Sequence, residues 1–264
     1  MTTEIPAPGL GTWQLEGDQS TETVRNAIEY DYRHIDTAQI YENEEQVGQA
    51  IQAADVPRDA LFVATKIWNK NLSPEKVRKT TEISLDKLGL DRVDLLYVHW
   101  PAGAYVADET LPAVQELQRD GLTEHVGLSN FTPELLEEAI DILGEPPLAH
   151  QVEMHPLLQQ RELHKLARKH DMYQVAYSPL KRTELLGNDV IQEIARETGG
   201  SPAQVCLAWH LSKEKVVPIP KATGIDHLRE NFSARNLHLS ENQIKRIDEL
   251  DAGDREIDPP FAPW

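Results

Sequence analysis

The strongest constraint on the fold is a regular alternation of short apolar runs with longer amphipathic segments. Each apolar run precedes a segment whose apolar residues recur at helical spacing. The expected strands are residues 5–13, 34–37, 61–67, 93–99, 125–129, 150–154, 173–177 and 216–219. Strands that alternate with helices form parallel sheets, so these eight units in 264 residues predict one (β/α)8 barrel domain over residues 1–264.

Capping residues locate the ends of several expected helices. Ser20 is expected to cap the first helix, and Ser73 begins a helix that ends at Gly89. Ser201 and Ser240 each begin a capping-box sequence. The second box opens an extra helix after the barrel, which is followed by an irregular, proline-rich C-terminal tail.

An open, doubly wound sheet is the alternative arrangement of such units. That fold usually carries a G-x-G-x-x-G sequence after its first strand. This chain offers only Gly9-Leu10-Gly11, which is too short a match. The barrel is therefore the better prediction.

The chain is strongly acidic, with 44 acidic residues against 26 basic ones and a net charge of −18. This charge argues against general affinity for nucleic acid, because binding requires neutralising phosphates with Lys and Arg. It also raises self-repulsion, which salt screens. Two interpretations stay open: a halophilic protein from a high-salt cytoplasm, or an ordinary acidic enzyme.

Other sequence features concern location. No apolar run approaches the length of a membrane span, and residues 1–6 lack the basic and apolar regions of a signal peptide. A single cysteine, Cys206, excludes an intramolecular disulfide. These features favour a cytoplasmic location without a membrane partner. We also expect the protein to be a monomer.

Four residues with chemically useful side chains fall at or just past the ends of consecutive expected strands. Asp36 ends one strand and Tyr41 follows in the next loop, while Lys66 and His99 end the next two. In a β/α barrel these strand ends meet at the rim that carries the active site. We therefore expect these four side chains to lie together.

The chemistry of these four residues suits the reduction of a carbonyl group. A lysine beside Tyr41 should favour the phenolate and lower its pKa, and an aspartate should keep that lysine charged. Tyr41 would then serve as a general acid, and His99 could donate a hydrogen bond to the same substrate oxygen. Singly, an aspartate at a strand end is more often a turn residue and a lone histidine is more often structural.

These residues stand within a longer series of motifs that resembles the aldo-keto reductase family. The series covers nearly the whole chain in the family's order, and the ending Asp254 to Trp264 is most similar to the bacterial 2,5-diketo-D-gluconate reductase branch. The matching segments are Gly9–Trp13, Tyr32–Ala38, Tyr41–Glu44 with Val47–Gly48, Thr65–Trp68, Asp94–Pro101, Gly127–Phe131, Gln151, Tyr177–Leu180 and Ile219–Lys221.

The resemblance implies an NADPH-dependent reductase with a role for each matching position. Tyr41 would donate the proton, Lys66 and Asp36 would tune it, and His99 would orient the substrate. The implied cofactor-binding residues are Thr12; Ser129, Asn130 and Gln151 at the carboxamide; Tyr177 on the nicotinamide ring; Ser178 to Leu180 at the pyrophosphate; Lys221, Thr223 and position 227 at the 2′-phosphate; and Glu230 and Asn231 at the adenine. No metal is implied.

The chain departs from the family's pattern at several positions. The serine expected after Lys221 is Ala222, and the arginine expected six positions after it is His227. Arg229 lies nearby as a possible substitute. These changes predict NADPH preferred but NADH accepted. In addition, the family's N-terminal hairpin is truncated here, and Asp31 replaces a glycine.

Tryptophans supply the expected substrate pocket. The resemblance makes Trp13, Trp68 and Trp100 its walls, and the tail around Trp264 could close it. A core position is the alternative, and we judge it equally open for Trp100 and Trp264. Small aldehydes, α-dicarbonyls and keto sugars all suit an aromatic pocket with little cationic lining. Trp209 and Cys206 are expected in the core instead.

Two rival functions fit parts of the sequence. A metal-dependent hydrolase could use His34, Asp36, His99 and His150, but His34 and His150 fall earlier in their strands than the rim. A cofactor-binding regulatory barrel without turnover is also conceivable, because a fold can be kept for binding alone. The complete set of four rim residues argues against that.

Overall fold

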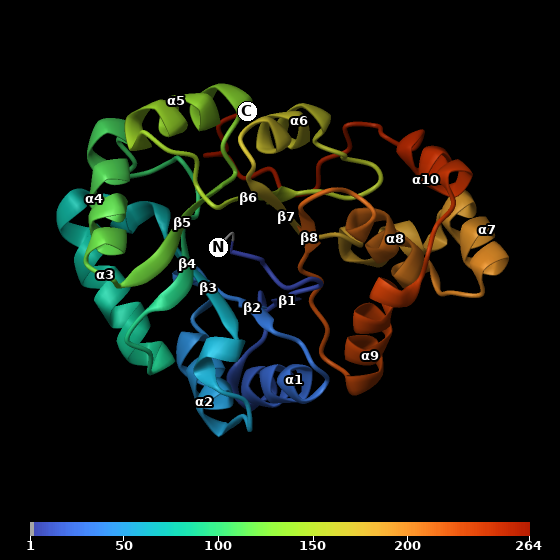
Figure 1. Cartoon of the computed structure of the whole chain (residues 1–264), viewed down its shortest axis with the longest axis horizontal. Helices are drawn as coiled ribbons and strands as arrows, with labels where there is room; N and C mark the ends of the chain where they lie inside the picture. The colour runs from blue at the N-terminus through green and yellow to red at the C-terminus, as the bar shows by residue number, and fades with distance from the viewer. Residues whose placement is uncertain (1–2) are drawn as a thin grey trace.

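The structure, a computed structural model, describes residues 3–264 and shows eight parallel strands in chain order around a ring (Figure 1). Each strand pairs with the next in parallel register. This confirms the predicted (β/α)8 fold. The strands are β1 (Leu10–Gly11), β2 (His34–Asp36), β3 (Phe62–Ile67), β4 (Val93–Val98), β5 (Thr123–Ser129), β6 (Ala149–Glu153), β7 (Tyr173–Tyr177) and β8 (Val216–Pro218).

Glycines allow the first strand to lie against the last. The Gly9 amide donates to the Pro218 carbonyl at 3.0 Å, and the Gly11 amide donates to the Pro220 carbonyl at 3.2 Å. A Cβ atom at Gly11 would lie only 2.7 Å from the Ile219 carbonyl oxygen. Any larger residue would push β1 away from β8, so glycine is required for the ring to close.

Helices surround the ring of strands (Figure 1). They are α1 (Gly17–Glu29), α2 (Glu44–Ala53), α3 (Pro74–Leu88), α4 (Ala107–Arg119), α5 (Pro133–Leu143), α6 (Arg161–Lys169), α7 (Asp189–Thr198), α8 (Pro202–Leu211), α9 (Ile225–Ser233) and α10 (Glu241–Asp248), with 3₁₀ turns η1 (Gln39–Tyr41), η2 (Arg58–Ala60), η3 (Asn69–Asn71), η4 (Lys181–Gly187) and η5 (Ala234–Asn236).

Most helix boundaries agree with the capping signals. Both side-chain bonds of the capping box form at Ser201 and at Ser240, and Gly89 ends α3 in the left-handed conformation. The prediction for Ser20 was wrong: α1 begins at Gly17, and Ser20 lies buried inside the helix. The first strand was also predicted too long, because only two residues of 5–13 pair as β1.

The barrel interior is a packed core of its own. Its buried side chains come from alternate strand positions: Phe62, Ala64, Leu95, Tyr97, Ala149, Val175, Val217 and Ile219. Ile5, only 2% exposed, joins this cluster from the segment before β1, which crosses the middle of the ring in Figure 1. This extended segment therefore packs into the barrel interior through Ile5, with Ala7 beside it.

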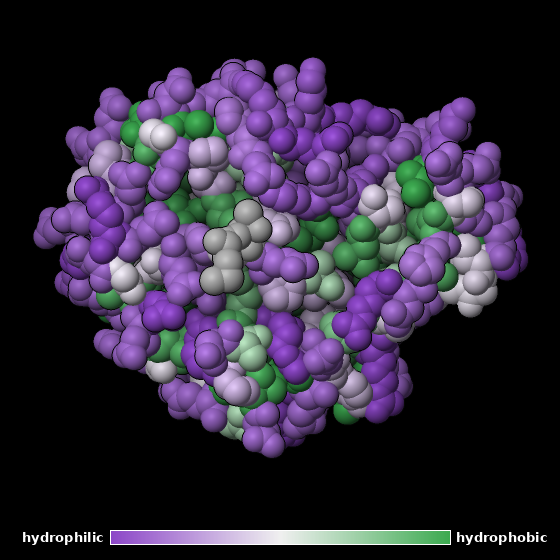
Figure 2. Space-filling view, in the orientation of Figure 1, coloured by the Kyte–Doolittle hydropathy of each residue, from purple (hydrophilic) through white to green (hydrophobic). Residues whose placement is uncertain are grey.

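The surface is largely polar. Figure 2 shows one face of the molecule, on which hydrophilic residues dominate and hydrophobic ones form scattered patches. Within residues 3–264, no helix combines the length and the apolar character that a membrane span requires.

Candidate active site

A buried ion pair stands at the centre of the candidate site. The Lys66 ammonium, on β3, donates to a carboxylate oxygen of Asp36 at the end of β2 and to the Thr37 carbonyl at 2.8 Å. The Gln151 amide on β6 donates to the other Asp36 oxygen at 2.8 Å. Lys66 is fully buried and Asp36 nearly so. Because each charge keeps close partners, the pair is held in one geometry despite its desolvation.

Tyr41 and His99 lie beside this pair, as the sequence predicted. The turn η1 follows β2 and brings the Tyr41 hydroxyl to 3.5 Å from the Lys66 ammonium nitrogen. His99 follows β4, and its ring lies 5.9 Å from the Tyr41 ring, edge to face. We call Asp36, Tyr41, Lys66 and His99 the catalytic corner.

The environment sets the protonation of the corner. Burial, with the nearby Asp36 carboxylate, raises the pKa of Tyr41 well above its usual value. The expectation that Lys66 would lower it was therefore wrong for this form of the protein, because desolvation of the phenolate outweighs attraction to the lysine. Burial and the Lys66 charge hold the pKa of His99 well below its usual value. Tyr41 thus carries its proton at neutral pH, and His99 is uncharged.

Polar side chains behind the corner fix its backbone. The Thr12 hydroxyl donates to the Asp36 carbonyl at 2.9 Å, and Asn43 links Thr37 to the Thr12 carbonyl. Glu44, which is buried, accepts a hydrogen bond from Thr65 at 2.7 Å beside Lys66. Thr12 was expected to touch a cofactor, but its hydroxyl is buried and occupied in this way.

A cluster of amides and hydroxyls adjoins the corner at the ends of β5, β6 and β7. Ser129 pairs with Gln151 across the sheet. The Asn130 amide donates to the Ser129 hydroxyl and to the His99 carbonyl, each at 3.0 Å. The Tyr177 hydroxyl donates to the Asn130 side-chain oxygen at 2.8 Å. Four predicted cofactor residues therefore converge on one place.

The loop after β7 has an unusual backbone. Ser178, Lys181, Arg182 and Thr183 all adopt positive φ angles although none is glycine. Such angles are costly for these residues and persist only where surrounding contacts hold them. The partly buried Leu180 side chain packs against the core formed with α7 and α8.

The last predicted set extends from the loop after β8 into α9, and we call it the β8–α9 group: Lys221, Thr223, His227, Glu230 and Asn231. Lys221, Thr223 and His227 are exposed, whereas Asn231 is buried. The His227 ring nitrogen lies 3.3 Å from a Glu230 carboxylate oxygen. Arg229 has another partner, because its guanidinium lies 4.6 Å from the ring centre of Tyr30, the residue that follows α1.

Aromatic side chains form a chain of contacts that leads outward from His99. Trp68 lies 5.3 Å from His99, and Phe261 of the tail lies 6.0 Å from Trp68. Trp100 contacts both Phe261 and Trp264, each at 5.4 Å between ring centres. Trp68 and Trp100 thus belong to a wall that the tail completes. Trp13 stands apart from them and is 38% exposed.

Comparison with known proteins agrees with this geometry. A model of the aldo/keto reductase family matches residues 9–252. The chain belongs to the aldo/keto reductase family. It is 41% identical to methylglyoxal reductase DkgB of Escherichia coli O157:H7, over 97% of this chain and 96% of that protein. It is 39% identical to glyoxal reductase of Bacillus subtilis, over 96% and 91%.

A solved structure agrees as well. A crystal structure provisionally named 2,5-diketo-D-gluconic acid reductase B has 33% identity and a TM-score of 0.95, over 98% of this chain and 92% of that one. The resemblance to the aldo/keto reductases, including that branch, is thereby confirmed.

As an aldo/keto reductase, this chain should hold a nicotinamide dinucleotide, and its residues fit one. The side chains of Ser129, Asn130 and Gln151 supply donors and acceptors for a carboxamide. The Tyr177 ring offers an apolar face beside them. Lys221, exposed and outside every ion pair of residues 3–264, leaves a cation available to a phosphate.

The residues of the rival metal site are not brought together. Residues 3–264 contain no group of three or more His, Cys, Asp or Glu side chains placed to hold a metal ion. His150 accepts a hydrogen bond from the Phe131 amide at 3.3 Å, and His34 packs edge to face on Phe62. Both histidines are buried and serve packing.

Sequence reasoning missed two cationic side chains that stack on tryptophans considered for the pocket. The Arg182 guanidinium lies 5.1 Å from the Trp13 ring centre, and that of Arg255 lies 3.7 Å from the Trp264 ring centre. The pocket was expected to have little cationic lining. Nothing in the local sequence marks either residue, because both are placed by contacts between the tail and the loop after β7. Trp209 and Cys206 are buried in the core, as predicted.

Proposed function

We propose that this aldo/keto reductase reduces small aldehydes, α-dicarbonyls or keto sugars to alcohols, with NADPH preferred and NADH accepted. The observation that carries the proposal is the catalytic corner, in which a protonated Tyr41 lies against a buried Lys66 and an uncharged His99. The names of the relatives, methylglyoxal reductase and glyoxal reductase, favour α-dicarbonyl substrates.

When bound, the reduced nicotinamide supplies a hydride to the carbonyl carbon. Tyr41 gives its hydroxyl proton to the carbonyl oxygen, which would otherwise gain a negative charge in water-poor surroundings. His99, being neutral, donates a hydrogen bond to the same oxygen and aligns it. The raised pKa of Tyr41 keeps the proton in place until the oxygen becomes basic enough to take it.

Lys66 and its partners stabilise the phenolate that Tyr41 forms when it gives up its proton. Once Tyr41 has lost its proton, the Lys66 ammonium at 3.5 Å stabilises the phenolate. Asp36 and the Thr37 carbonyl hold that ammonium in place, and Gln151 holds Asp36. Ser129 and Asn130 orient the carboxamide, and Tyr177 supports the ring. Lys221 and Thr223 meet the 2′-phosphate.

The test is a turnover assay in which loss of NADPH or NADH is followed with methylglyoxal, glyoxal and a keto sugar. We expect turnover with both cofactors and a larger kcat/KM with NADPH. Fluorescence titration of each cofactor runs in parallel. Tight binding of NADPH without oxidation by any carbonyl would favour the regulatory barrel instead, and stimulation of turnover by added Zn²⁺ would reopen the metal-dependent alternative.

A further inference from the structure

The C-terminal tail holds one arginine in an unusual state. Arg255 is half-buried, and its guanidinium carbon lies 3.7 Å from the Trp264 ring centre. No ion pair or side-chain hydrogen bond within residues 3–264 includes the Arg255 side chain. A half-buried cation is normally paired, because partial desolvation costs free energy. Arg255 therefore keeps its donors available at the pocket.

The acidic residues on either side of Arg255 are already engaged elsewhere. Asp254 forms an ion pair with the buried ammonium of Lys181. Glu256 accepts from the Arg182 guanidinium at 2.8 Å. Both cations come from the loop after β7, so the two acids dock the tail on that loop. Because both carboxylates already have cationic partners, neither forms an ion pair with Arg255.

Backbone contacts fix the tail on both sides of Arg255. The Asp254 amide donates to the Leu157 carbonyl at 3.0 Å. The Glu256 and Ile257 amides donate to the two carboxylate oxygens of Glu153, at 2.9 Å and 2.8 Å. Glu153, at the end of β6, is fully buried. The Arg255 backbone is therefore held on the barrel from both sides.

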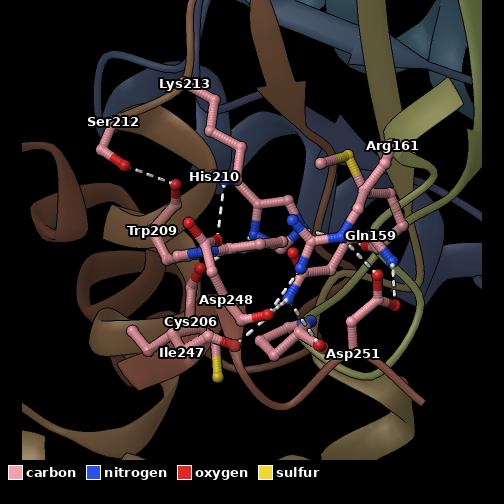
Figure 3. A network of polar contacts seen from close by, with 12 residues as sticks. Gln159, Arg161, Cys206, Trp209, His210, Ser212, Lys213, Ile247, Asp248 and Asp251 are labelled. Atoms are coloured by element: carbon pink, nitrogen blue, oxygen red, sulfur yellow. Dashed lines mark hydrogen bonds and ion pairs between the residues drawn. The ribbon is translucent and has the colours of Figure 1, made fainter. Parts of the chain in front are cut away.

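The tail also starts from a fixed point, which Figure 3 shows. The Gln159 amide donates to the Ile247 carbonyl at 3.1 Å, and Arg161 donates to the Asp251 carboxylate at 2.7 Å. Trp209 and Lys213 of the α8 end both donate to Asp248, at 2.8 Å and 3.0 Å. The last turn of α10 is thus tied to two neighbouring segments before the tail crosses the rim.

A series of ring contacts connects Arg255 with the catalytic corner. Its partner Trp264 contacts Trp100, which reaches Phe261 and Trp68 and then His99. The charge of Arg255 is also close enough to Tyr177 to oppose the rise in the Tyr177 pKa that burial causes. A substrate lying between His99 and Trp264 would meet this guanidinium at its outer end.

We propose that Arg255 binds a carboxylate on the substrate, so that the enzyme selects carbonyl compounds with a negative charge away from the reacting carbonyl. This inference rests on the proposed function and names the substrate class. A guanidinium offers paired donors that match a carboxylate, and stacking on Trp264 holds its plane. A protein of net charge −18 repels anions, so a free cation at the pocket mouth is needed to draw one in.

The experiment compares two aldehydes that differ only in charge, 4-carboxybenzaldehyde and its methyl ester, methyl 4-formylbenzoate. We expect the native enzyme to reduce the acid with the higher kcat/KM. Arg255→Gln should lower kcat/KM for the acid by about tenfold to hundredfold, mainly through KM, because one charged hydrogen-bonding partner is lost. The ester should change by less than about twofold.

Two further variants separate recognition from general charge and structure. Arg119→Gln removes the same charge from the exposed end of α4 and should leave kcat/KM for both aldehydes unchanged. Arg255→Lys keeps the charge but loses the planar fork, so kcat/KM for the acid should fall by less than in Arg255→Gln. Losses in Arg255→Gln that are equal for acid and ester, or absent for both, would overturn the proposal.

Failure of the proposed function would look different. If the native enzyme reduced neither these aldehydes nor methylglyoxal, glyoxal or a keto sugar, the proposed reaction would be wrong. Titration of tryptophan fluorescence with the two aldehydes would still decide the role of Arg255, because Trp264 lies directly beneath its guanidinium. Preferential binding of the acid that is lost in Arg255→Gln would support carboxylate recognition, and equal binding of acid and ester would refute it.

Discussion

The catalytic corner and the β8–α9 group lie along one proposed cofactor site, yet they are held very differently. In the corner, Lys66 is fully buried and contacts three oxygens from β2 and its following loop. In the β8–α9 group, the His227 side chain is 73% exposed, and within residues 3–264 its one polar side-chain contact is with Glu230. The first set lies on or next to strands, and the second lies on a loop and on α9.

The difference shows which functional residues also stabilise the fold and which do not. A change at Lys66 would leave Asp36 as a buried charge without its partner, so reactivity and stability are linked there. A change at His227 meets mostly solvent, so it can alter cofactor choice at little cost to the fold. Reaction type should therefore be robust in this scaffold, and cofactor preference should vary easily. The predictions below test this contrast.

The largest effect is expected at Tyr41. Tyr41→Phe removes only the hydroxyl that donates the proton, so the protein should fold and bind cofactor normally. Carbonyl reduction should fall by about 10²–10⁴-fold, the usual contribution of general acid catalysis. Steady-state kcat with methylglyoxal is the measurement, and more than a tenth of native activity would show that Tyr41 is not the acid.

Tyr105→Phe is the matched control for that variant. The Tyr105 hydroxyl is also buried and has no hydrogen-bond partner within residues 3–264, but its ring packs on Phe131 away from Lys66. Activity should stay near the native level. The pH profile adds a second check: because the pKa of Tyr41 is raised, reduction should not decline between neutral pH and pH about 9, where an unperturbed tyrosine begins to lose its proton.

Packing beneath the corner should be nearly as sensitive. A Cβ atom at Gly127 on β5 would lie 2.5 Å from the Tyr97 ring, which fills the barrel interior. Gly127→Ala should therefore destabilise the protein by about 1–3 kcal/mol, as overpacked cores do. Thermal unfolding checks this. Gly187→Ala is the control, because no atom lies within 4 Å of its added Cβ; equal unfolding midpoints for the two variants would mean the interior yields.

How far the sequence predicts this molecule depends on where the information lies. The alternation of apolar runs predicts the barrel, because side-chain periodicity directly reflects burial in strands and helices. It also predicts that Tyr41 and Lys66 meet, because parallel strand ends share one rim. In the tail, Asp254 pairs with Lys181 and Glu256 pairs with Arg182, which leaves Arg255 between them unpaired within residues 3–264. These ion pairs join segments that are far apart in sequence. No local pattern encodes those contacts.

The direction of the Tyr41 pKa shift could not be predicted from the sequence either. From the sequence, Lys66 beside a tyrosine suggests a lowered pKa. The structure shows that the Tyr41 hydroxyl is partly buried near the Asp36 carboxylate, and that Asp36 already pairs with the ammonium. The sign of the shift depends on the balance between desolvation and attraction. That balance is a property of the assembled site and not of residue spacing.

Cofactor choice should respond at the exposed end of the site. His227→Arg places a planar, fully charged fork where a neutral imidazole stood, so KM for NADPH should fall by about tenfold while KM for NADH barely changes. The gain should shrink as salt screens the charges. KM for both cofactors at low and high KCl is the measurement.

Arg229→Gln is the companion variant. Because the Arg229 guanidinium stacks on Tyr30, its removal should leave the ratio of the two KM values unchanged. The assignment would be reversed if His227→Arg had no effect on NADPH and Arg229→Gln weakened it. In that case the arginine must leave Tyr30 to meet the phosphate, and the β8–α9 group would be less independent of the fold than we infer.

The smallest effect is expected from salt, and it concerns the surface common to both regions. The net charge of −18 makes the folded protein repel itself, and salt shortens the reach of that repulsion. Salt also screens the exposed ion pairs, such as Arg168 with Glu214, but each contributes only about 0–1 kcal/mol. We therefore expect the unfolding midpoint to rise by a few degrees, on the order of 1 kcal/mol of stability, between low and molar KCl.

The response of the unfolding midpoint to salt, measured together with activity, separates the two interpretations of that charge. The buried corner is shielded from salt, so kcat should persist in molar KCl. A rising midpoint with retained kcat supports the high-salt interpretation, whereas a midpoint that is flat or falls leaves an ordinary acidic enzyme. KM for an anionic aldehyde should meanwhile rise with salt if Arg255 attracts it, while KM for its neutral ester stays constant. If salt raised KM only for the anionic aldehyde, the charge at Arg255 would be shown to act on substrate binding, while the buried corner stays insensitive to salt.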